Sequence, residues 1–290
     1  MSGVTSTIRN KTHFRMNIRN FLVPAGKPFS GLASGLSIFL TFLYLINVFV
    51  YPINDHIILK PDSLYTFDLN RISLYPLAHL SIFHLFFNVI SIYPMISMFE
   101  ESHGTLYTGV ILNLLAVFSA IPYCIIGSVF FPNVEVGGAS GWFFSFLGYF
   151  GVKESRIRPS AMVTTNRSFP TIYFPLALLA ITAFLVPGSS LPGHSIGLAI
   201  GYFMGFKENV VAKLVPSSNI LKKIETFADP LINKIPFGIK YYREVEVNRS
   251  SEYNSIYIGS ESTLPLHSTT QPAQPSQATP FQGNGRVLGA

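Results

Sequence analysis

The chain has 290 residues, of which 49% are hydrophobic and only 12% are charged, and its formal net charge is +6. Soluble domains carry about 25% charged residues, so the composition argues against an ordinary soluble domain and favours a chain that crosses a membrane several times. The single cysteine, Cys124, excludes an intrachain disulfide.

Six stretches of the sequence are nearly free of charge over roughly the length that a membrane helix needs. They lie around residues 33–51, 82–99, 106–127, 140–152, 170–187 and 195–206. The fourth and sixth are short, but Gly- and Ser-rich flanks extend them. We therefore expect an all-α polytopic membrane protein whose six transmembrane helices occupy residues 31–210.

The segments outside these stretches differ from them in composition. Residues 1–30 form a basic arm that is expected to be cytosolic, with a mitochondrial presequence as the alternative. A cleaved signal peptide is not expected, because the first apolar run starts late and is long enough to span a membrane. Residues 211–246 form a juxtamembrane segment, and its amphipathic stretch 216–236 is expected to lie on the membrane surface. Residues 247–290 are rich in Ser, Thr, Gln and Pro, which predicts a disordered tail.

Basic residues indicate the orientation of the chain. They gather before the first predicted span, between the fourth and fifth, and after the sixth. By the positive-inside rule both termini are then cytosolic, and the second, fourth and sixth spans begin on the lumenal side. The sequons at Asn10, Asn166 and Asn248 face the cytosol in this topology and are expected to be unglycosylated.

Polar side chains stand at the lumenal starts of three predicted spans. His79, His84 and Asn88 open the second, Ser140 opens the fourth, and His194 opens the sixth. Polar groups inside a bilayer are costly unless they are paired or hydrated. Their common depth therefore predicts a shared polar cavity.

Stripes of small residues occur on two of these spans. Such stripes let membrane helices approach each other backbone to backbone. If the two stripes meet, Ser140 and His194 come together at the lumenal end of the contact. The stripe of the sixth span consists of Gly193, Gly197, Gly201 and Gly205, and that of the fourth consists of Gly141, Ser145 and Gly148.

A serine hydroxyl becomes an effective nucleophile when a base removes its proton, and histidine is the base best matched to neutral pH. Ser140 and His194 are therefore a candidate nucleophile and base, and Phe144, one turn after Ser140, is a candidate to stack on the imidazole. An attacked carbonyl also needs donors for its developing negative charge. The backbone N–H of Ser140 and the side chains of His84 and Asn88 are candidates for this role.

The polar residues also admit two simpler interpretations. Each residue taken alone is compatible with a structural role, as helix-packing serine or as hydrogen-bonded histidine, and only the combination favours catalysis. A zinc site is not expected, because zinc hydrolases present histidines at i and i+4 with a Glu between them, whereas His79 and His84 are five apart without an acid. That separation, about 140° around a helix, suggests that His79 braces the loop instead. No metal or cofactor is expected.

Together these residues resemble the rhomboid intramembrane serine proteases, over about residues 70–206. The resemblance implies that Ser140 is the nucleophile, that His194 is the general base, and that single-pass membrane proteins are cut at small residues in or near the bilayer. Fungal Golgi-type members are the most similar in their six-span layout. The matching motifs are His79-x4-His84-x3-Asn88, Gly138-Ala139-Ser140-Gly141 and Gly193-His194 followed by Gly197 and Gly201, with structural support of the site assigned to His79, Phe144, Gly138, Gly141, Gly197 and Gly201.

Other positions follow or depart from the family pattern. Glu100 corresponds to the acid that usually closes the second helix. Arg71 corresponds to the Arg of a Trp-Arg pair in the first lumenal loop, but Asn70 replaces the Trp. Phe144 stands where a Tyr is common and keeps a stacking ring.

The end of the tail, residues 281–288, resembles the SHP box, F-x-G-x-G-x-x-L, which binds the N-terminal domain of the valosin-type AAA ATPase. Phe281 and Leu288 would be apolar anchors in a polar tail, and Gly283 and Gly285 would let the backbone lie close to the partner. The resemblance thus implies recruitment of that ATPase, and no nucleic-acid partner is expected.

Two other classes of protein compete with the protease hypothesis. A non-catalytic derlin-like adaptor would carry an SHP box but would lack the serine and histidine pair that this chain retains. A transporter would be expected to carry charged residues deep in its spans, where none is found in the sequence.

Overall fold

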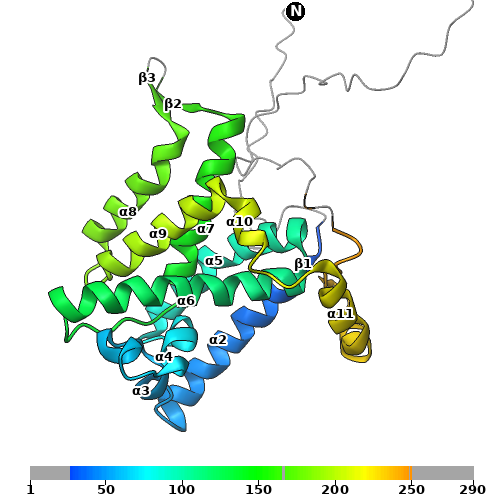
Figure 1. The fold of residues 1–290 in the computed structure, drawn as a ribbon, viewed down its shortest axis with the longest axis horizontal. Helices are drawn as coiled ribbons and strands as arrows, with labels where there is room; N and C mark the ends of the chain where they lie inside the picture. Colours follow the sequence, from blue (N-terminus) through cyan, green and yellow to red (C-terminus); the bar gives the residue numbers. More distant parts are fainter. Residues whose placement is uncertain (1–26, 165–166, 248, 250–290) are drawn as a thin grey trace, which may run out of the picture. The chain divides into compact units, whose positions relative to one another are not determined.

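The apolar stretches of the sequence are helical, because a chain in lipid must satisfy its own backbone N–H and C=O groups. A computed structural model describes residues 27–164, 167–247 and 249 (Figure 1). In this part of the chain the predicted spans correspond to α2 (Gly31–Phe49), α5 (Ile82–His103), α6 (Thr105–Phe130), α7 (Ser140–Ile157), α8 (Phe174–Leu185) and α9 (Leu191–Phe206).

Three of these helices, α2, α5 and α6, are long and apolar enough to cross a membrane. The prediction of an all-α membrane protein is therefore confirmed, whereas the count of six spans stays a prediction for the shorter α7, α8 and α9. The second unit of the chain, Tyr257–Ala290, lies outside the described residues. The predicted disorder of the tail, its SHP box and nearly all of the basic arm therefore also lie outside them.

Short elements connect the long helices. The connection between α2 and α5 was expected to be a loop, but it holds several helical turns, and the connection between α7 and α8 is an antiparallel hairpin. A parallel pair of two-residue strands joins the start of α2 to the segment after α11. The connecting elements are α3 (Asn54–Ile57), η1 (Pro61–Leu64), α4 (Leu69–Leu74), η2 (Tyr75–Leu77), β2 (Ser160–Thr164), β3 (Arg167–Pro170) and η3 (Thr171–Tyr173). β1 (Phe29–Ser30) precedes α2, and α10 (Glu208–Ala212), α11 (Ser218–Ile232) and β4 (Ile239–Lys240) follow α9.

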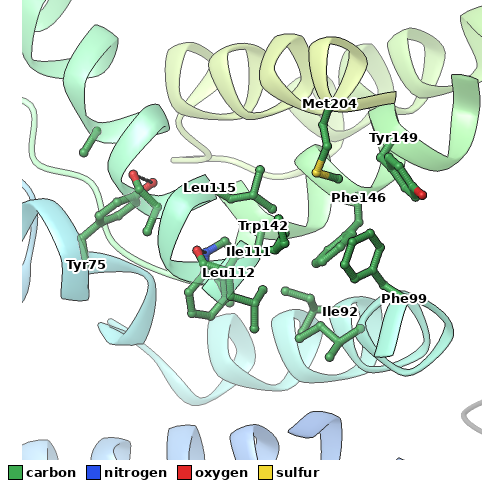
Figure 2. Packing of buried hydrophobic residues seen from close by; sticks show 14 of the residues in the cluster. Tyr75, Ile92, Phe99, Ile111, Leu112, Leu115, Trp142, Phe146, Tyr149 and Met204 are labelled. Carbon is green, nitrogen blue, oxygen red and sulfur yellow. Dashed lines mark hydrogen bonds between the residues drawn. The ribbon is translucent and has the colours of Figure 1, made fainter. Parts of the chain in front are cut away.

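The core lies between α5, α6 and α7 (Figure 2). Trp142 of α7 is buried there, and its indole N–H donates a 2.8 Å hydrogen bond to the carbonyl of Leu112 in α6, as a buried indole requires. α2 packs mainly against α5, and α9 packs against α7. The core side chains in Figure 2 include Ile92, Phe99, Ile111, Leu115, Phe146, Tyr149 and Met204.

Glu100 is completely buried near the end of α5 and caps a different helix, α2. Its carboxylate accepts hydrogen bonds from the backbone N–H groups of Leu32 (2.8 Å) and Ala33 (3.2 Å), and from the hydroxyls of Ser30 and Thr105. The first N–H groups of a helix have no acceptor within the helix and favour a negative charge. The acid therefore ties the start of α2 to the turn between α5 and α6.

We expect Glu100→Ala to lower the free energy of unfolding by about 3 kcal/mol or more, because it leaves buried donors unpaired. Glu101→Ala is the matched control, since Glu101 is half-exposed and its ion pair among the described residues is with the exposed Lys27, an arrangement worth at most about 1 kcal/mol. Unfolding in detergent micelles, followed by circular dichroism, measures both values. Equal losses in the two variants would contradict the capping role.

The segment after α9 returns to this same end of the bundle. Thr105 donates its backbone N–H to the carbonyl of Tyr242, and the N–H of Tyr242 donates to the Thr105 hydroxyl, both at 2.9 Å. Glu225 of α11 is buried and accepts the backbone N–H of Glu244 at 2.9 Å. The juxtamembrane segment is thus joined to the α5–α6 turn.

α11 is amphipathic. Leu221 is buried on the side that faces the bundle, whereas Ile220, Ile224 and Phe227 are exposed, Phe227 to 89%. The apolar outer side is the feature that a membrane-surface helix requires. Its position on the membrane surface stays a prediction.

Candidate active site

Ser140 and His194 occupy the beginnings of two neighbouring helices. Ser140 is the first residue of α7, and His194 lies in the first turn of α9. The Nε2 atom of His194 lies 2.9 Å from the Oγ atom of Ser140, a normal hydrogen-bond distance. The structure therefore brings the two residues together, in the geometry that a nucleophile and its base require.

Glycine allows this contact between α7 and α9. A Cβ atom added at Gly201 would lie 1.9 Å from the carbonyl oxygen of Ser145, and one added at Gly197 would lie 2.7 Å from that of Gly141. These positions admit no side chain, so the two backbones touch, as the small-residue stripes predict. The Ser145 hydroxyl lies within hydrogen-bond distance of the carbonyls of Gly141 (2.9 Å) and Gly197 (3.0 Å) and links the helices further.

The imidazole of His194 is held by an aromatic ring. Its centroid lies 4.5 Å from that of Phe144, with 29° between the ring planes, and both residues are buried. Phe144 follows Ser140 by four residues, so both lie on the same side of α7. The expected stacking is present, and it restricts the rotation of the base.

The turn before Ser140 is shaped by Gly138 and by the ring of His84. Gly138 has a φ of +108°, a conformation that L side chains rarely adopt. A Cβ atom there would also lie 2.6 Å from the Cε1 and Nε2 atoms of His84. His84 therefore packs directly against the turn that presents Ser140, close to the predicted reaction centre.

The connection between α2 and α5 also holds the segment that leads into this turn. Leu59 and Val136 exchange two backbone hydrogen bonds of 2.9 Å in an antiparallel bridge. Arg71 holds the connection itself, donating to the carbonyl of Ile58 at 2.7 Å, to the carboxylate of Asp68 at 2.8 Å and to the carbonyl of Asp55. Arg71 thus orders this loop although Asn70 stands beside it in place of the family's Trp.

In the described part of the chain, neither His79 nor Asn88 forms a hydrogen bond with Ser140 or His194. His79 lies in the loop before α5; its Nδ1 is 3.1 Å from the carbonyl of Leu77, and its ring lies 5.1 Å from that of His84. The bracing role of His79 stays a prediction. The Asn88 amide is buried and donates at 2.8 Å to the backbone carbonyl of His84, so in this structure it is directed at its own helix.

Beside the pair lies a small cavity that is lined by Ser140 and His194 but not by His79, His84 or Asn88, so it is less extensive than the shared polar cavity that the sequence predicts. Its volume is about 10 Å³, enough for one water molecule. Tyr75 and Ser119, whose side chains carry hydroxyl groups, also line it. The sequence shows Ser119 only as a serine within the apolar run of α6. It does not show which residues that side of the helix faces, so its place beside the pair could not be predicted.

Comparison with known protein families identifies a rhomboid domain at residues 66–208. The chain is 76% identical to Rhomboid-type serine protease 2 of Kluyveromyces lactis, over 94% of this chain and all of that protein. It is 45% identical to the protein of the same name in Saccharomyces cerevisiae, over 87% of this chain and 96% of the relative. The chain belongs to the rhomboid family.

Family membership confirms the resemblance predicted from the three motifs. The chain is a rhomboid-type serine protease and an integral membrane protein, and the substrates of such a protease are membrane proteins in a lipid bilayer. A further relative, Rhomboid-type serine protease 2 of Candida albicans, is 34% identical over 89% of this chain and 91% of its own length. These findings favour the protease over the derlin-like adaptor.

Proposed function

We propose that this rhomboid cleaves transmembrane proteins with Ser140 as nucleophile and His194 as general base, near the lumenal face of the membrane. The observation that carries the proposal is the 2.9 Å contact between His194 Nε2 and Ser140 Oγ at the beginnings of two helices packed through glycine. Loss of cleavage in variants of these two residues is the test, and its expected size is given in the Discussion.

The first half of the reaction forms an acyl-enzyme. His194 takes the proton of the Ser140 hydroxyl as its oxygen attacks the carbonyl carbon of the substrate. The tetrahedral intermediate collapses when His194 returns that proton to the leaving amine. The ester between Ser140 and the substrate's acyl group remains.

The second half hydrolyses this ester. A water molecule that enters the small cavity would lie beside His194, which is one of its lining residues. His194 then removes a proton from this water as the water oxygen attacks the ester carbonyl. The proton then passes to Ser140 as the acid product leaves.

We assign the negative charge of both intermediates to three donors. The backbone N–H of Ser140 is at the positive end of α7, and the His84 ring packs against the adjoining turn. Asn88 would join them if its side chain rotated and broke its hydrogen bond to the carbonyl of His84. Such donors often tighten only once the substrate is bound.

We also propose that both termini are cytosolic, in a Golgi or other secretory-pathway membrane. Lys153, Arg156 and Arg158 lie in or directly after the last turns of α7, at the opposite end of this helix from Ser140. The positive-inside rule then places the cationic end in the cytosol and the reaction centre on the lumenal side.

The SHP box gives a second proposal, recruitment of a valosin-type AAA ATPase by residues 281–288. We expect Phe281→Ala to lower capture of the ATPase N-terminal domain by at least about tenfold, because it removes an apolar anchor. Gln282→Ala, at a variable position of the motif, should leave capture unchanged, and neither variant should alter peptide hydrolysis in detergent. Equal capture by Phe281→Ala and the unaltered chain would remove this proposal.

A further inference from the structure

A second and larger cavity lies between α6, α9 and the segment around α10. Its volume is about 340 Å³, within the range of about 300–1,000 Å³ that is typical of ligand pockets. The lining residues are apolar and include Leu114 and Phe118 of α6, Phe203 of α9, and Val211 and Leu214 around α10. Ser140 and His194 are not among them.

The lengths and contacts of the helices explain this space. α9 is fixed against α7 by its glycines and has only 16 residues, about 24 Å, whereas the hydrocarbon core of a bilayer is about 30 Å thick. α6 has 26 residues and is therefore longer than α9. Phe118 and Phe203 are partly exposed, so the cavity is a groove that opens on the outside of the bundle.

Two lysines lie close in the sequence to residues that line the groove. Lys207 directly follows α9, and Lys213 lies between the lining residues Val211 and Leu214; both lysines are exposed. Neither forms an ion pair with any residue in the described part of the chain. The adjacent acid, Glu208, is instead held by Lys153 at 2.8 Å and by the Tyr149 hydroxyl.

We propose that this groove binds one anionic phospholipid. One acyl chain lies along the apolar wall between α6 and α9, and the phosphate headgroup lies against Lys207 and Lys213. Water has no polar partner in such a groove, whereas a hydrocarbon chain fits it. A cation near a membrane surface contributes about 1 kcal/mol toward binding an anionic lipid, so the lysines select the headgroup. In the proposed topology this lipid belongs to the cytosolic leaflet.

Photolabelling of the full-length chain in detergent tests this site. The probe is phosphatidylglycerol with a diazirine in one acyl chain, and adducts are mapped by mass spectrometry. We expect adducts to concentrate on residues 111–122 and 200–214, and unlabelled phosphatidylglycerol to compete about tenfold better than phosphatidylcholine. The labelling should persist in Ser140→Ala, so its outcome is independent of the catalytic proposal.

Matched variants distinguish the site of the lipid acyl chain from the site of its headgroup. Leu114→Trp, which fills the groove, should remove the adducts. If that variant does not fold, Leu214→Trp at the open end of the groove should have the same effect. Ile125→Trp, outside the lining of the groove, should keep the adducts. Lys207→Gln combined with Lys213→Gln should abolish the preference for phosphatidylglycerol. The same loss of charge on α11, Lys222→Gln with Lys223→Gln, should not.

Three results would overturn the proposal. Adducts spread evenly over the apolar surface would show that the groove is not selective, and equal competition by the two lipids would remove the headgroup assignment. If the groove residues formed crosslinks between two copies of the protein in place of lipid adducts, the occupant would be a second copy.

Discussion

Ser140→Ala and His194→Ala are each expected to lower the rate of cleavage of a single-pass membrane protein by on the order of 10⁴-fold or more. The two residues act as a unit, because the hydroxyl attacks only when the imidazole accepts its proton. The double variant should therefore lose little more than either single variant. Quantitative gel analysis of substrate cleavage in proteoliposomes measures the three rates.

Ser195→Ala is the control for these variants, because it makes the same chemical change beside His194 in α9. It should retain cleavage, and all variants should keep the unfolding midpoint of the unaltered chain. Undiminished cleavage by Ser140→Ala, in protein of normal stability, would remove Ser140 from the mechanism.

Gly201→Ala is expected to lower the free energy of unfolding by more than about 3 kcal/mol and to abolish cleavage. The added Cβ atom would lie 1.9 Å from the carbonyl oxygen of Ser145, so α7 and α9 must separate. Overpacking of a core commonly costs about 1–3 kcal/mol even where side chains can move, and here the obstacle is backbone. Thermal unfolding in detergent and the cleavage assay measure the two effects.

Gly109→Ala in α6 is the matched control, since a Cβ atom there meets nothing within 4 Å. It should keep full activity and should not lose stability, because alanine is the better helix former. If Gly201→Ala were as stable as Gly109→Ala, the close contact of α7 and α9 would not hold the site together.

Hydropathy predicted where the long helices lie, because lipid leaves the backbone few alternatives to a helix. It was less accurate at their ends. α7 continues to Ile157 through charged residues such as Lys153, which lie beyond the apolar run but are compatible with a helix. α9 begins at Leu191, before the predicted start, since Pro192 suits a first turn and the Ser190 side chain accepts the N–H of Gly193.

The sequence also predicted the meeting of Ser140 and His194, because the glycine period of α9 determines which side of the helix packs closely. It did not predict the roles of partners distant in the chain. The capping of α2 by Glu100 and the loop contacts of Arg71 depend on tertiary packing, as do the hydroxyls of Tyr75 and Ser119 beside the pair. Local patterns carry no signal for such contacts.

Reaction of the full-length chain with a fluorophosphonate probe tests most directly whether His194 activates Ser140. Mass spectrometry of the labelled protein should place the adduct on the Oγ atom of Ser140, and His194→Ala should lose that adduct while it stays folded. A folded chain whose Ser140 is not labelled, or is labelled equally without His194, would contradict the account.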